Sequence, residues 1–197
     1  MDKKAIKEFF DACAVNWDSN QVRNDKVIKK ILDNAGIGEN MDVLDVACGT
    51  GVLFPDYLSR NVNSVCGIDI SDEMIKRASE KYLSYDKINL ICGDVECTQF
   101  DKSFDAIVVY NAFPHFPNPE NLISVLCSVL KTDGILTIAH GMSKADVDNH
   151  HKGPAHHVSI GLMEIEALKL IMSKFLSVTV SVSNSEMYQI VGIKRHD

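Results

Sequence analysis

The fold class of this chain is decided by "VLDVACGTG", residues Val43–Gly51. The stretch begins in a short apolar run, residues 41–46, which is typical of a strand buried on both faces. It closes in a glycine turn, and the residues that follow, 52–59, suit a helix. A buried strand, a glycine turn and a helix in this order predict the opening of a βαβ unit. Such a turn presents backbone amides to a ligand at a helix N-terminus.

The alternation of strands and helices continues along the chain. A last helix and two strands that alternate with period 2 follow, and these strands predict an antiparallel hairpin. Strands separated by helices predict a mostly parallel sheet covered on both faces, a doubly wound α/β sandwich. In such a sandwich, ligands bind at the carboxyl ends of the central strands. We expect strands at 62–70, 88–94, 104–110, 134–140, 176–182 and 187–194, and helices at 3–15, 22–34, 71–83, 119–130 and 161–175.

Charge and composition limit the class of partner. The 197 residues carry a net charge of −7, whereas nucleic-acid binding favours a basic face, so we expect a small-molecule substrate and no nucleic acid. The six cysteines form no CxxC pair and are interpreted as reduced thiols. No segment approaches the roughly 18 apolar residues of a membrane span, and the N-terminus lacks a signal-peptide core. The expectation is a cytoplasmic protein without a membrane partner.

Acidic residues follow three successive predicted strands. Asp69 comes 24 residues after Asp45, and Asp94 comes 25 residues after Asp69. A carboxylate at the second strand end can accept hydrogen bonds from both ribose hydroxyls of a nucleoside, and one at the third can accept from an adenine amino group. The third glycine of GxGxxG is missing, which disfavours a nicotinamide-dependent oxidoreductase.

With these features the chain resembles the class I S-adenosylmethionine-dependent methyltransferases, and within them the small-molecule, ubiquinone/menaquinone methyltransferase-like group. The resemblance runs from about Phe9 to Leu136, through "VLDVACGTG", "GIDIS", "CGDVE", "FDAIVVYNAFPHF" and "LKTDGIL". It implies a seven-stranded sheet of order 3-2-1-4-5-7-6 with strand 7 antiparallel. It also implies one domain over residues 1–197, with N-terminal helices in 1–38 and a Rossmann-like core in 39–197.

The resemblance also implies which residues bind S-adenosyl-L-methionine. Asp45, Ala47, Gly49 and Gly51 would contact its methionine part. The ribose and the adenine would be held by side chains after the next two strands, and the loop after the fourth strand would border the cofactor through its backbone. These further positions are Asp69 and Ile70 for the ribose, Asp94 and Val95 for the adenine, and Asn111 and Ala112 for the border.

Two segments are candidates for the acceptor side of the site. The proline-stiffened loop "YNAFPHFPNP", residues 110–119, places His115 where a substrate approaches the methyl group. His115 is either a base or substrate contact, or a histidine that packs the loop. Trp17 and Asp18 belong either to a lid over the cofactor, as the family analogy implies, or to surface packing.

A histidine-rich loop is predicted at residues 140–157, after the fifth strand. It contains five of the seven histidines of the chain. One hypothesis is a metal site for a divalent transition metal such as zinc, which imidazoles commonly bind. The alternatives are a proton-handling or anion-binding lid and a solvated loop. The candidate metal ligands are a subset of His140, His150, His151, His156 and His157, and His140 is also a candidate catalytic residue.

The combined interpretation is S-adenosylmethionine-dependent methyl transfer to a small-molecule acceptor, assisted by a metal if the histidine loop binds one. The alternative is a protein that binds S-adenosylmethionine or S-adenosylhomocysteine without catalysis, as a sensor. Only turnover separates the two, because an intact nucleoside site predicts binding in both. The sequence predicts neither the acceptor atom nor the oligomeric state.

Overall fold

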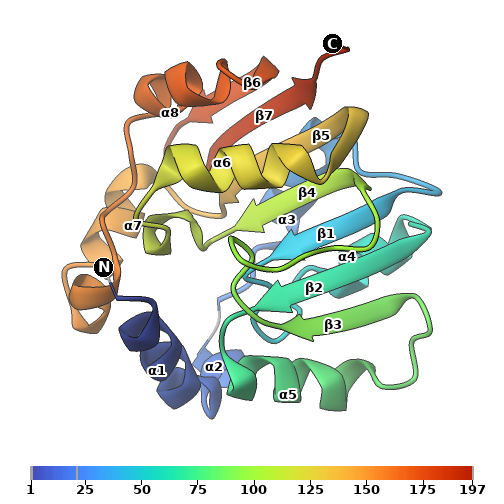
Figure 1. Ribbon diagram of the computed structural model, residues 1–197. Coiled ribbons are helices and arrows are strands. Elements are labelled where there is room, and N and C mark those ends of the chain that lie inside the picture. The colour runs from blue at the N-terminus through green and yellow to red at the C-terminus, as the bar shows by residue number, and fades with distance from the viewer. Residues whose placement is uncertain (1, 21, 197) are drawn as a thin grey trace.

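The computed structural model describes residues 2–20 and 22–196 and contains a seven-stranded sheet (Figure 1). The strand order is β3-β2-β1-β4-β5-β7-β6, which confirms the expected order. β7 pairs antiparallel with both β5 and β6, as expected, and the other pairs are parallel. The strands are β1 (Asp42–Val46), β2 (Ser64–Asp69), β3 (Ile88–Cys92), β4 (Phe104–Tyr110), β5 (Leu130–His140), β6 (Leu176–Ser183) and β7 (Tyr188–Lys194).

Parallel pairing brings the carboxyl ends of the first five strands to one edge of the sheet, on the left in Figure 1. Val46 pairs with Ile68, and Asp69 pairs with Cys92, so the last residues of β1, β2 and β3 lie side by side. The glycine turn and the residues after β3 therefore leave the sheet at neighbouring points. This register places widely separated parts of the sequence around one site.

Helices cover both faces of the sheet and bury two apolar layers. α6 (Pro119–Ser128) and α8 (Ile165–Met172) pack on one face, and α3 (Asp25–Asn34), α4 (Phe54–Ser59) and α5 (Asp72–Tyr82) pack on the other. α6 begins at the residue predicted for the helix at 119–130. Pro119 is its first residue, and the Asn118 side chain accepts a hydrogen bond from the amide of Asn121 at 3.1 Å.

A buried amide network fastens α3 to the sheet. The Gln189 side chain of β7 donates to the Ile31 carbonyl at 2.8 Å and to the Thr137 hydroxyl at 3.1 Å. It accepts from the Asn34 side chain at 2.9 Å. Gln189 is fully buried, so these partners satisfy a polar group that would otherwise be costly in the core.

The remaining helices lie at the carboxyl edge of the sheet, on the left and lower left of Figure 1. They are α1 (Lys3–Ala14), α2 (Trp17–Asn20), α7 (Lys144–His150) and the 3-10 helices η1 (Phe113–His115) and η2 (Pro154–Val158). The expected histidine loop is therefore corrected to two helical pieces. Ser143 caps α7 by accepting from the amide of Asp146 at 3.1 Å, and Val147 anchors the helix in the core. Within residues 2–20 and 22–196, no helix has both the length and the apolar character needed to cross a membrane.

Candidate active site

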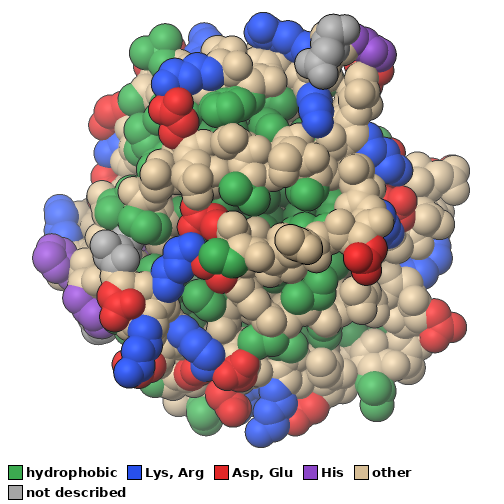
Figure 2. All heavy atoms as spheres, viewed as in Figure 1, with side chains coloured by type: hydrophobic (Ala, Val, Ile, Leu, Met, Phe, Trp, Pro, Cys, Tyr) green, Lys and Arg blue, Asp and Glu red, His purple; other side chains and the backbone are tan. Residues whose placement is uncertain are grey.

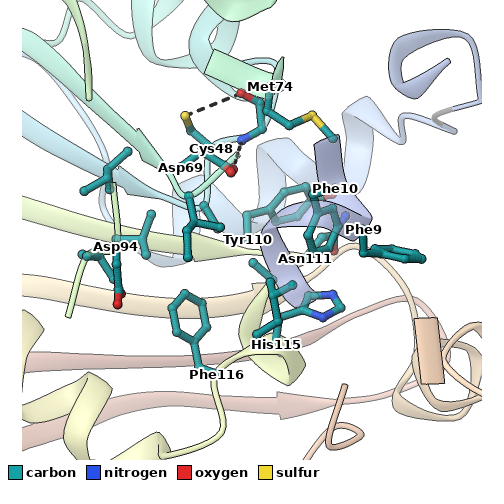
Figure 3. Close-up of a pocket in the computed structure, with 18 of the residues that line it drawn as sticks. Phe9, Phe10, Cys48, Asp69, Met74, Asp94, Tyr110, Asn111, His115 and Phe116 are labelled. Carbon is teal, nitrogen blue, oxygen red and sulfur yellow. Dashed lines mark hydrogen bonds between the residues drawn. The ribbon is translucent and has the colours of Figure 1, made fainter. Parts of the chain in front are cut away.

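A cavity of about 340 Å³ opens at the carboxyl ends of the central strands, between the sheet and α1. In Figure 3, Cys48 and Asp69 lie on one side of this cavity, and His115 and Phe116 lie on the other. Of the predicted cofactor-binding, catalytic and metal-ligating residues, those that line the cavity are Ala47, Gly49, Asp69, Ile70, Asp94, Val95, Asn111, Ala112, His115, His150 and His151.

The two glycines of the turn after β1 have different structural roles. Both have positive φ angles, 55° at Gly49 and 83° at Gly51. The side chain that Gly49 lacks would point toward Trp17 and the sulfur of Met74, both of which line the cavity. At Gly51, an added Cβ would lie 2.6 Å from a ring carbon of Phe54. Gly49 therefore keeps the cavity wall open, whereas Gly51 allows α4 to pack closely against the turn.

Asp69 is held in place at the cavity wall by backbone amides. Its Oδ2 accepts a hydrogen bond from Gly49 N at 2.8 Å, and its Oδ1 accepts from Ser71 N at 2.9 Å. The side chain is only 7% exposed, and burial raises the pKa of Asp69 although these hydrogen bonds oppose the shift. The carboxylate oxygens keep lone pairs for further donors such as ribose hydroxyls.

Asp45 lies behind the wall rather than on it. It is buried in β1, and its Oδ2 has no hydrogen-bond partner in the described part of the chain. Burial, with the nearby charge of Asp69, raises the pKa of Asp45 well above its usual range. Asp45 therefore lies near the cavity but is not one of the residues that line it.

Asp94 lies two residues beyond β3 and is tied to α1. The Lys3 ammonium donates to Asp94, and the same ammonium lies 2.8 Å from the carboxylate of Glu96. Asp94 also accepts a hydrogen bond from the amide of Glu96 at 3.0 Å. Asp94 and Lys3 both line the cavity, so this acid faces it with one charged partner already in place.

Hydrogen bonds connect the residues that follow β4 to Gly141, directly after β5, and to Val158 of η2. Asn111, with a φ of 54°, accepts a hydrogen bond from the amide of Gly141 through its side chain at 2.9 Å. Nδ1 of His115 lies 2.7 Å from the carbonyl oxygen of Val158. Burial lowers the pKa of His115 to about 4, and the nearby ring of His151 contributes to this shift.

Aromatic residues of α1 and α2 close the cavity. The ring of Phe10 makes edge-to-face contacts with Trp17, at a centroid distance of 5.8 Å, and with His115, at 4.9 Å. Trp17 lines the cavity, and Asp18 instead bonds to Thr50 and to Lys81. Sequence reasoning did not name Lys3 or Phe10 as site residues. The adjacent phenylalanines of α1 are the signal that could have found Phe10, whereas the role of Lys3 depends on its ion pairs with the distant Asp94 and Glu96.

The five histidines of residues 140–157 separate in the structure. His140 is 2% exposed within β5, and its Nε2 has no partner among the described residues. Burial lowers the pKa of His140 to about 3. His150 and His151 line the cavity, whereas His156 and His157 are exposed on η2. Figure 2 shows exposed histidine side chains at the left of the molecule, where Figure 1 places the helices at the carboxyl edge of the sheet.

The structure gives no support to the predicted metal site. Across residues 2–20 and 22–196, no group of three or more His, Cys, Asp or Glu side chains is arranged to hold an ion. The helical conformation of α7 and η2 keeps the two histidine pairs apart. His150 and His151 lie at the cavity, whereas η2 leaves His156 and His157 exposed on the surface.

Comparison with known proteins identifies the domain. The family described as "Methyltransferase domain" matches residues 44–138. The chain is 28% identical over 142 residues to the malonyl-[acyl-carrier protein] O-methyltransferase of Acetivibrio thermocellus, covering 71% of this chain and 50% of that protein. It is 32% identical over 148 residues to the demethylmenaquinone methyltransferase of Staphylococcus aureus, covering 68% and 61%. The chain spans about half the length of the curated relatives it matches first.

Solved structures agree on the fold. A chain in the complex between the Haloferax volcanii Trm112 methyltransferase activator and a methyltransferase superposes with a TM-score of 0.81 at 20% identity, covering 97% of this chain and 98% of that one. The match of residues 44–138 spans β1 to β5 and so includes each strand end that borders the cavity. By sequence, residues 44–138 are therefore a methyltransferase domain, and the chain shares the fold of solved S-adenosylmethionine-dependent methyltransferases.

Proposed function

We propose that this chain transfers the methyl group of S-adenosylmethionine to a small-molecule acceptor. The observation that carries the proposal is the position of Asp69, whose carboxylate is fixed by the amides of Gly49 and Ser71 at the wall of the cavity. A buried acid with spare lone pairs, next to an open glycine turn, suits a ribose with two hydroxyl donors. The names of the curated relatives support methyl transfer.

The residues of the cavity fit the parts of this cofactor. The open space at Gly49, which a Cβ would partly fill, suits the methionine part. Asp69 and Ile70 would hold the ribose, Asp94 and Val95 the adenine, and Asn111 with Ala112 the border toward the acceptor. When bound, the cofactor supplies a methyl group activated by a positively charged sulfur.

The protein contributes alignment and exclusion of water. Methyl transfer is an in-line displacement, so holding the two reactants at the correct angle and distance supplies much of the rate. The rings of Phe10, Trp17 and Phe116 line the cavity and replace water around the reacting atoms. The sheet edge fixes one reactant, and α1 with η1 confines the other.

Turnover is the test that separates this function from cofactor binding by a sensor. Purified protein is incubated with S-adenosylmethionine and pooled acceptors that include phenols, thiols, amines and carboxylates, and S-adenosylhomocysteine is measured. We expect acceptor-dependent formation that Asp69→Asn reduces. If S-adenosylmethionine binds but S-adenosylhomocysteine never exceeds the level without acceptor, the proposal of catalysis is contradicted and the sensor is favoured.

A further inference from the structure

The two sides of the cavity differ in chemistry. The cofactor side, at the ends of β2 and β3, contains the acids Asp69, Asp94 and Glu96. The opposite side, formed by α1, η1 and the segment from α7 to η2, is called here the acceptor side. Its lining includes Phe9, Phe10, Phe116 and the imidazoles of His115, His150 and His151. Aromatic and aliphatic groups dominate this side, and its polar groups are imidazoles.

No free charge faces the acceptor side from the described residues that line the cavity. Lys3 is their only Lys or Arg, and it is paired with Asp94 and Glu96. Asp69 is bound by two backbone amides on the cofactor side. A carboxylate or an ammonium on the acceptor would be desolvated there without a partner of opposite charge, which is costly. The acceptor side therefore favours an uncharged molecule with an apolar body.

His115 is the polar group that the acceptor would meet. A carbonyl oxygen only accepts hydrogen bonds, so the 2.7 Å contact with the Val158 carbonyl places the ring proton on Nδ1. Nε2 then has a lone pair, and no hydrogen bond of the described chain uses it. The edge of the ring is also fixed against Phe10 at a centroid distance of 4.9 Å. The geometry thus presents a neutral imidazole with one fixed acceptor nitrogen.

A second imidazole lies next to the first. The ring of His151 is 5.1 Å from that of His115, centroid to centroid, and it is half-buried between the cavity and the surface. Its Nδ1 has no hydrogen-bond partner in the described part of the chain. A proton received by His115 therefore has a neighbouring basic group on the way to solvent.

We propose that the acceptor is an uncharged, largely apolar molecule that presents one O–H or S–H group to Nε2 of His115. The inference rests on the methyl transfer proposed above. The oxygen or sulfur lone pair forms a bond to the methyl carbon, and the bond from that carbon to the sulfonium breaks. Its electron pair stays on the sulfur of S-adenosylhomocysteine, while the acceptor proton passes to His115. The methylated oxygen or sulfur is strongly acidic until it loses this proton, so a weakly basic imidazole suffices.

Four probes of one size test the charge preference. Phenol and benzyl mercaptan are uncharged near pH 7, benzoate is an anion, and benzylamine is a cation. Each is incubated separately with the whole chain and S-adenosylmethionine, and the rate of S-adenosylhomocysteine formation is measured. We expect phenol or benzyl mercaptan to react at least about tenfold faster than both charged probes, because one uncompensated charge costs more than 1.4 kcal/mol.

His115→Asn tests the role of the imidazole. Asparagine can keep a donor near the Val158 carbonyl but has no acceptor at the place of Nε2. We expect its rate with the uncharged probes to fall about 10²-fold or more, the usual contribution of a general base. Its affinity for S-adenosylhomocysteine should remain within about twofold, which shows that the site is folded. The matched control, His196→Gln, changes an exposed histidine paired with Asp133 and should leave the rate unchanged.

Each result decides the proposal. Faster reaction with benzoate or benzylamine would overturn the preference for an uncharged acceptor. An unchanged rate in His115→Asn would overturn the role of Nε2. Failure of both uncharged probes to react, while S-adenosylhomocysteine binds, would overturn the proposal of an uncharged O–H or S–H acceptor. A protein that does not bind S-adenosylmethionine would instead contradict the proposed function itself, and the acceptor proposal with it.

Discussion

Alanine substitutions at the two glycines after β1 should separate packing from binding. Gly51→Ala places a Cβ 2.6 Å and 2.8 Å from ring carbons of Phe54 and 2.8 Å from one of Tyr82, at a φ of 83°. Phe54 is fully buried, so it has little room to move. Gly49→Ala has a similar backbone conformation, but its nearest neighbour is Trp17 at 3.7 Å. The first change strains the core, whereas the second narrows the cavity.

The magnitudes follow from these contacts. A left-handed conformation costs alanine roughly 1–2 kcal/mol, and overpacking a core costs about 1–3 kcal/mol. Gly51→Ala therefore loses about 2–5 kcal/mol of unfolding free energy, the sum of both costs. Gly49→Ala loses only the roughly 1–2 kcal/mol of the left-handed conformation. At about 2–4 °C per kcal/mol for a domain of this size, Tm falls by roughly 4–20 °C for Gly51→Ala. Gly49→Ala should instead weaken binding of S-adenosylhomocysteine by about 5–150-fold, the equivalent of 1–3 kcal/mol.

Thermal unfolding followed by circular dichroism and calorimetric titration with S-adenosylhomocysteine measure the two effects. Gly38→Ala is the control for stability, because its added Cβ meets no atom closer than 3.9 Å and its φ is not in the left-handed range. A Tm of Gly51→Ala equal to that of the parent would refute the packing argument. Equal affinity of Gly49→Ala and the parent would refute the assignment of Gly49 to the binding wall.

Two further predictions concern the interior. Burial lowers the pKa of His140 to about 3 and that of His115 to about 4, below the value near 6.5 of an unfolded histidine, so the unfolded chain binds more protons as the pH falls. The free energy of unfolding should therefore fall below pH 6.5, by about 2 kcal/mol per histidine at pH 5. Measured by urea unfolding, it should fall less steeply with decreasing pH in His140→Gln than in the parent. Equal dependence on pH in the two proteins would contradict the prediction. Gln189→Leu removes three buried hydrogen bonds, two of which tie α3 to the sheet, and should lower stability by about 2–4 kcal/mol. The exposed control Gln99→Leu should change stability by less than about 0.5 kcal/mol in the same urea assay.

The sheet, and the position of Gly49, Asp69 and Asp94 around one cavity, could be predicted because the relevant signals are local. A buried strand followed by glycines, and an acid at the end of each of the next two strands, act through periodicity and register. The strand order itself came from the family resemblance. The acceptor side was harder to predict because it is built from contacts between distant segments, such as Phe10 of α1 with His115 of η1.

The histidine segment shows why spacing alone was insufficient. The mostly polar segment of α7 is helical because Ser143 caps the helix and Val147 anchors it in the core. One cap and one buried residue are too few to give a helical pattern in the sequence. Likewise, the sequence cannot distinguish Gly49 from Gly51, because the difference lies in which neighbour would meet a side chain. Both features depend on tertiary contacts that composition and periodicity do not contain.

Calorimetric titration with S-adenosylhomocysteine measures whether the cavity at the ends of β1 to β4 holds the demethylated cofactor. Binding at one site is expected. Asp69→Asn should weaken it by about 10–150-fold, because hydrogen bonds to a charged group contribute about 1.5–3 kcal/mol. Asp101→Asn, at an exposed position away from the cavity, should bind like the parent. Absence of binding by the parent protein, or an affinity that Asp69→Asn leaves unchanged, would contradict the account.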